Sequence, residues 1–159
     1  MLLAHRAVVP LKVFLAVMFA VLVLLQTMSL PGQFAYMAEQ SPDMAHLRWP
    51  LTALAVFWVL CVQAVVVATW RLLTLVSRDR IFSEAAFAWV DLIIGAVVAA
   101  WVVLGFASLW VALNADDPGF PILVFLVDVS VTVLLLLMLV MRALLRQATA
   151  LRTDLEGVI

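Results

Sequence analysis

Charged side chains are scarce in this sequence. Lys and Arg number nine and Asp and Glu ten among 159 residues, so the formal net charge is only −1. A protein that grips nucleic acid by its phosphates needs a strongly basic face, and we therefore expect no direct binding to nucleic acid. The single cysteine, Cys61, excludes an intramolecular disulfide, and we interpret it as a packing residue.

Sequence motifs for catalysis and cofactor binding are also missing. The chain has no Gly-rich phosphate loop, no His-Glu-x-x-His and no Gly-x-Ser-x-Gly. It also lacks the internal repeat that indicates a transporter built from duplicated halves. Asp43 and His46 would share one helical face, but two candidate ligands are too few for a metal site. We expect a protein that is not an enzyme and that holds neither a metal ion nor a cofactor.

Apolar residues, in contrast, make up 68% of the chain, and the mean hydropathy is +1.24, whereas roughly half of a soluble domain is apolar. A helix needs about 20 apolar residues to cross a bilayer. Four runs meet this length, at about 11–30, 51–76, 85–113 and 122–141. They lack the polar alternation of a barrel strand, so each should be a helix. The sequence predicts an all-α integral membrane four-helix bundle, one domain over 1–159. We expect the first run to be a retained anchor, because it exceeds the apolar core of a signal peptide.

The basic residues predict the orientation of these spans. Eight of the nine flank the same side of the bilayer, and only Arg48 lies on the other. The eight are Arg6 and Lys12, then Arg71, Arg78 and Arg80, and finally Arg142, Arg146 and Arg152. By the positive-inside rule, both termini and the loop near 77–84 should be cytoplasmic. The connections 31–50 and 114–121 should lie outside, the first with a short helix over 41–49 that ends at Pro50.

Two polar residues inside the spans are candidates for an ion pair. Arg71 lies about five residues before the end of the second run, and Asp91 about six residues into the third. Because the chain reverses between them, both should reach a similar depth, where pairing lowers the cost of each charge. Asp91 shares a helical face with Gly95 and Ala99, small residues that allow another helix to approach closely.

Asp128, about six residues into the fourth run, has no cation at its depth within the spans. One interpretation is a hydrogen-bonded clamp between helices. The other is functional, since an intramembrane acid is a candidate site by default. A small oligomeric channel or transporter would then use Asp91, Arg71 and Asp128. A third interpretation, a bundle that binds lipid or quinone, has only the aromatic content behind it.

The C-terminal segment 142–157 is amphipathic. Apolar residues recur there at helical spacing, namely Leu144, Ala148, Leu151, Leu155 and Ile159. The fourth span should therefore continue as a helix into the cytoplasm. We expect a surface there that binds anionic head groups or a protein partner, and a simple solvated helix is the alternative. The residues of this predicted binding surface are Arg78, Arg80, Arg142, Arg146, Leu151, Arg152 and Leu155.

Two stretches, "RDRIFSEAAFAWVDLIIGA" at 78–96 and "MRALLRQATALRTDLEGVI" at 141–159, together with the order of the four spans, resemble the DUF2975 family. This family comprises uncharacterised bacterial four-span membrane proteins, here of the actinobacterial type. The resemblance implies a multi-pass protein of the bacterial plasma membrane. Members are often encoded beside small helix-turn-helix regulators, which implies a regulatory or accessory role with such a partner. The family supplies no catalytic residues.

Overall fold

The computed structural model describes residues 2–158, and over this range every regular element is a helix. Four helical stretches are long and apolar enough to cross a membrane, at Arg6–Gln40, Pro42–Ser77, Glu84–Asn114 and Gly119–Val158. The prediction of four candidate membrane spans in an all-α protein is thus confirmed. The chain divides after Asp79 into two compact units, which we describe separately.

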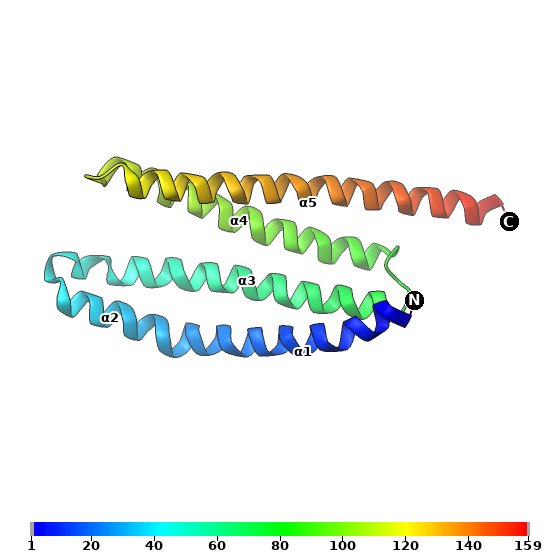
Figure 1. Cartoon of the computed structure of the whole chain (residues 1–159), viewed down its shortest axis with the longest axis horizontal. Coiled ribbons are helices and arrows are strands. Elements are labelled where there is room, and N and C mark those ends of the chain that lie inside the picture. Colours follow the sequence, from blue (N-terminus) through cyan, green and yellow to red (C-terminus); the bar gives the residue numbers. More distant parts are fainter. Residues whose placement is uncertain (1, 159) are drawn as a thin grey trace. The chain divides into compact units, whose positions relative to one another are not determined.

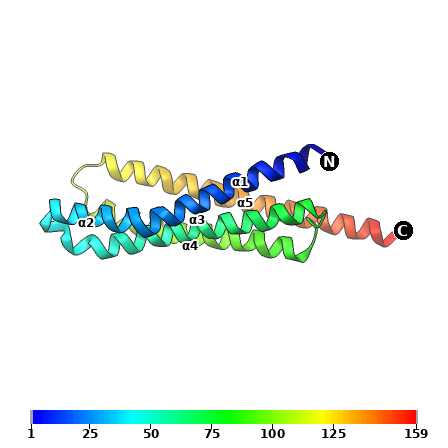
Figure 2. The ribbon, with the colours of Figure 1, turned by 90° about the horizontal axis from the view of Figure 1, so that it is seen from below.

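The first unit is an antiparallel helical hairpin. It begins with α1 (Leu2–Leu24), passes through the π-helical turn η1 (Leu25–Ser29) and continues as α2 (Leu30–Gln40). The 3₁₀ turn η2 (Pro42–Leu47) then reverses the chain. Helix α3 (Arg48–Ser77) runs back along α2 and α1 (Figure 1, Figure 2).

Two prolines explain where this hairpin departs from the prediction. The segment 31–50 is almost entirely helical rather than a loop. Pro31 is the second residue of α2, two positions after the end of η1, and at this junction the backbone N–H of Leu30 bonds to the carbonyl of Leu25. Such a π turn relieves the clash between a proline ring and the carbonyl four residues earlier. The expected short helix exists as η2, but Pro50 does not end it. Pro50 lies in the first turn of α3, where no intrahelical partner for its nitrogen is needed.

The second unit is also an antiparallel pair. Helix α4 (Glu84–Asn114) and helix α5 (Gly119–Val158) are joined by the short turn 115–118. Ser83 flanks the start of α4 in an extended conformation and Glu84 is its first residue, where a negative charge suits the helix dipole. The Ser83 hydroxyl donates to the carbonyl of Arg80 at 2.8 Å rather than capping the helix.

One face of α5 packs on α4. Its half-buried positions recur at spacings of three and four, which is the seam of an antiparallel helical pair. They include Val124, Asp128, Val131, Leu135, Met138, Arg142 and Leu145. With 40 residues, α5 is about 60 Å long, roughly twice the thickness of the hydrocarbon core. Its last turns continue past the first residue of α4 (Figure 1).

Candidate functional site

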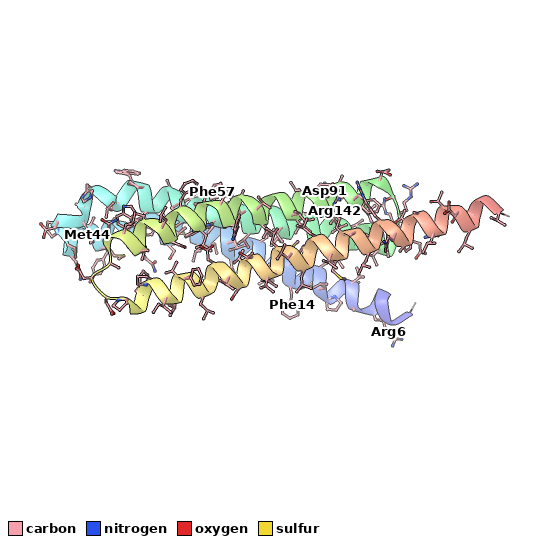
Figure 3. The ribbon with its side chains drawn as sticks, turned by 90° about the horizontal axis from the view of Figure 1, so that it is seen from above. Arg6, Phe14, Met44, Phe57, Asp91 and Arg142 are labelled. Atoms are coloured by element: carbon pink, nitrogen blue, oxygen red, sulfur yellow. The ribbon has the colours of Figure 1, made fainter. Side chains whose placement is uncertain are left out.

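An ion pair joins the two helices of the second unit. The Nη2 of Arg142 donates to Oδ2 of Asp91 at 2.8 Å, and its Nε donates to Oδ1 of the same carboxylate. Figure 3 shows the two side chains next to each other. This is the two-pronged geometry that makes arginine a strong and directional partner for a carboxylate. Asp91 is the eighth residue of α4, so the pair lies within a candidate membrane span rather than at its end.

The sequence analysis assigned these residues differently. Arg142 was predicted to lie on the cytoplasmic surface, and Asp91 was predicted to pair with Arg71. The structure shows an ion pair between Asp91 and Arg142. Arg71 belongs to the first unit and Asp91 to the second, so their pairing stays a prediction. Within the second unit nothing packs on Gly95, because no atom lies within 4 Å of where its Cβ would stand. That Gly95 and Ala99 allow the close approach of a helix from outside the second unit stays a prediction.

A second polar contact lies further along the same helices. The Trp101 indole N–H donates to Oγ1 of Thr132 at 2.9 Å, and the Thr132 hydroxyl donates to the backbone carbonyl of Asp128 at 2.8 Å. Trp101 lies ten residues after Asp91 on α4, and Thr132 lies ten residues before Arg142 on α5. The two contacts therefore belong to one continuous antiparallel register.

One oxygen of the Asp128 carboxyl group, Oδ1, is buried without a hydrogen-bond partner among the described residues. Thr132 bonds the backbone of Asp128 and not its carboxyl group. Thr132 and Trp101 form the hydrogen bond between the two helices near this position, and both interpretations of the Asp128 carboxyl group, the clamp and the functional site, stay predictions.

Contacts between basic and aromatic side chains join the C-terminal part of α5 to the loop before α4 and to the first turn of α4. The Arg152 guanidinium lies 4.8 Å from the ring centre of Phe82, and that of Arg146 lies 6.0 Å from the ring centre of Phe87. Such cation–π contacts hold a flexible arginine over a fixed ring. Arg152 also pairs with Glu156, one turn further on, at 3.2 Å.

The apolar stripe of α5 is uncovered in the second unit. Leu144, Leu151 and Leu155 are 54%, 64% and 68% exposed, and Ile159 lies outside the described residues. Leu151 follows the half-buried Thr149 by two residues, so it lies on the opposite side of the helix from α4.

We name the surface formed by Arg80, Phe82, Arg146, Leu151, Arg152 and Leu155 the loop–tail surface. Arg78, predicted for the same surface, belongs to the first unit, where it directly follows the last residue of α3.

Lys12 in the first unit makes two contacts that were not predicted from the sequence. The Lys12 ammonium donates to Oγ1 of Thr74 at 3.0 Å and lies 5.4 Å from the ring centre of Trp70. Sequence analysis used Lys12 only as a flanking charge for orientation. The available signal was a lysine inside the first apolar helix and a Trp-Arg pair near the end of the next one, which an antiparallel hairpin brings together.

Among the described residues, no group of three or more His, Cys, Asp or Glu side chains could hold a metal ion.

Comparison with known families adds one finding. The family model described as a protein of unknown function, DUF2975, matches residues 32–159. The chain belongs to the DUF2975 family. Comparisons with curated proteins and with solved structures find no match.

The DUF2975 match includes both polar contacts between α4 and α5 and the whole loop–tail surface. Lys12 lies before the matched residues. Membership confirms the resemblance seen in the sequence. It assigns no chemistry to any of these residues, so a function must be argued from their arrangement.

Proposed function

We propose that this DUF2975 protein is a non-enzymatic regulatory or accessory subunit of the bacterial plasma membrane, with both termini in the cytoplasm. It engages a partner protein through the loop–tail surface. The observation that carries this proposal is the end of α5, which is held against the loop by Arg152 and Phe82 at 4.8 Å while Leu151 and Leu155 stay exposed.

The length of α5 supports this function. About 20 residues of its 40 are enough to cross the hydrocarbon core. The Asp91–Arg142 pair fixes the register of α5 against α4, so the surplus lies at the C-terminal end. A helix that leaves the membrane gains little from an apolar stripe unless something covers that stripe. An amphipathic helix laid in an apolar groove is a recurrent mode of protein recognition.

The charges around the stripe favour a protein partner. Arg152 is paired with Glu156 and stacked on Phe82, so the basic residue nearest to Leu151 and Leu155 already has partners. In the sequence, Asp154 lies between the two leucines and Glu156 directly follows Leu155. Both acids would repel an anionic membrane surface. A small cytosolic regulator, such as the helix-turn-helix proteins that the family resemblance associates with these chains, is the partner class that we propose.

Purification from native membranes tests this proposal. An N-terminally tagged chain in mild detergent should retain one stoichiometric companion, identified by mass spectrometry. Leu151→Glu with Leu155→Glu should lose it, because two charges are placed on the apolar stripe. Ala150→Glu with Thr153→Glu adds the same charge to another face of the helix and should retain it. A companion that persists in the leucine variant, or no companion at all, would contradict the proposal.

Asp128 favours a second candidate function. Its buried Oδ1 atom has no hydrogen-bond partner among the residues that the structure describes, and an unsatisfied polar atom in a membrane helix is costly unless it serves a purpose. A small oligomeric channel or transporter would use this acid to bind an ion or proton. Asp128→Asn should then change proton or cation flux in reconstituted vesicles. Flux equal to that of empty vesicles for the unmodified chain would exclude this candidate.

A further inference from the structure

A groove with a volume of about 520 Å³ lies between α1 and α3 in the first unit. This volume is in the range of sites that bind small molecules. Its floor is formed by Leu15 and Val66, which are 8% and 4% exposed. Its sides include Phe19, Val67 and Trp70, which are between 37% and 42% exposed. The groove is therefore apolar inside, and its sides are partly exposed.

One end of this groove is basic. Arg71 and Thr74 line it, and Thr74 accepts a hydrogen bond from the Lys12 ammonium at 3.0 Å. The Thr74 hydroxyl in turn donates to the carbonyl of Trp70 at 3.0 Å, so its oxygen is turned toward Lys12. The Trp70 ring lies 5.4 Å from the same ammonium. Neutral groups thus fix the position of the positive charge.

The charge of Lys12 is held but not neutralised within the unit. No carboxylate among the described residues pairs with Lys12, and the groove lining contains no acidic residue. The ammonium has three N–H donors, of which the structure assigns one to Thr74. A cation beside an apolar surface in a membrane helix is stabilised by an anion that can reach the same depth. A phosphate group carried by a lipid meets this requirement.

We infer that the groove binds one anionic phospholipid, with its phosphate at Lys12 and Arg71 and one acyl chain lying between α1 and α3. The lipid comes from the leaflet that surrounds the Lys12 end of α1. Basic pockets between membrane helices recognise anionic head groups in this way, and a tryptophan beside them is typical of the membrane interface. This inference does not depend on the partner proposed for the loop–tail surface.

Native mass spectrometry of the full chain in detergent tests the site. The delipidated protein is titrated with phosphatidylglycerol or with phosphatidylcholine of the same acyl chains. The first phosphatidylglycerol should bind more tightly than the first phosphatidylcholine. Lys12→Gln with Arg71→Gln should remove this preference, with affinity falling about fivefold for each lost charge. Arg78→Gln removes a neighbouring charge outside the groove lining and should leave the preference unchanged.

Two further variants separate the head group from the acyl chain. Lys12→Arg keeps the charge and should keep the preference, which shows that the charge rather than the lysine itself is required. The double glutamine variant should still bind phosphatidylcholine like the unmodified chain, which excludes misfolding as the cause of the lost preference. Ala16→Phe fills the groove and should weaken both lipids. Inorganic phosphate at millimolar concentration should displace neither. Equal binding of the two lipids by the unmodified chain, or an unchanged preference in the double glutamine variant, would overturn the inference. Displacement by phosphate, or unchanged binding in Ala16→Phe, would refute the acyl-chain site.

Discussion

Asp91 of α4 and Arg142 of α5 form a two-pronged ion pair inside two apolar helices, 51 residues apart in the sequence. Each residue gives the other an opposite charge where water is scarce. The pair also sets the register in which Trp101 meets Thr132 and in which the end of α5 reaches the loop.

Removing one member of the ion pair should destabilise the protein more than removing both. Arg142→Gln leaves the carboxylate of Asp91 unpaired in an apolar setting, and Asp91→Asn leaves the guanidinium unpaired. The double variant has neither charge, so its midpoint of thermal unfolding in detergent should exceed that of Arg142→Gln alone. If the losses of the two single variants simply added up in the double variant, the two residues would not interact.

The hydrogen bond from Trp101 to Thr132 should contribute modestly to stability. Trp101→Phe removes the indole donor, and Thr132→Val removes the acceptor while keeping a similar shape. A double-mutant cycle should yield a coupling free energy of about 0.6 kcal/mol, the average for hydrogen bonds between membrane helices. A coupling energy indistinguishable from zero would show that the contact at 2.9 Å does not stabilise the pair.

The aromatic contact at the end of α5 should hold that end in place. Phe82→Leu removes the ring under Arg152 but leaves the pairing of Arg152 with Glu156 intact. A cation–π contact at an exposed position is worth about 0.5–1 kcal/mol, so amide hydrogen exchange over 150–158 should accelerate roughly two- to fivefold. Exchange over 122–141, in the apolar part of α5, serves as the internal control and should not change.

The basic residues predict the orientation of the spans, and cysteine labelling can measure it. In a Cys61→Ser background, Thr153→Cys should react only with a reagent that reaches the cytoplasm, because the positively charged ends face inward. Asn114→Cys, at the opposite end of α4, should react with an impermeant reagent added outside intact cells. The reverse pattern would contradict the orientation and, with it, a cytoplasmic loop–tail surface.

The sequence was sufficient to predict the four long helices, because about 20 consecutive apolar residues have few alternatives to a membrane helix. It was less informative about their ends. Pro31 and Pro50 were interpreted as boundaries, yet a π turn accommodates the first and the first turn of α3 accommodates the second. Proline is compatible with a helix at such places.

The contact between Asp91 and Arg142 shows what hydropathy does not provide. Depth along the membrane normal suggested Arg71, since both residues lie a few positions from the same loop. Depth does not specify which helices are neighbours or which faces meet. In the structure, Arg142 lies on the half-buried face of α5 together with Asp128 and Leu135, at intervals of seven residues. That repeat is visible in the sequence, but it becomes meaningful only once α4 is known to be the neighbour.

The proposal that the loop–tail surface binds a partner can be tested most directly by photo-crosslinking in living cells. A photoreactive amino acid is placed at Leu155 on the exposed apolar stripe and, as a matched control, at Ala150 on another face of α5. We predict that Leu155 yields one crosslinked protein of defined mass and that Ala150 yields it weakly or not at all. Equal crosslinking from both positions, or none from Leu155 beyond lipid, would contradict a partner-binding function.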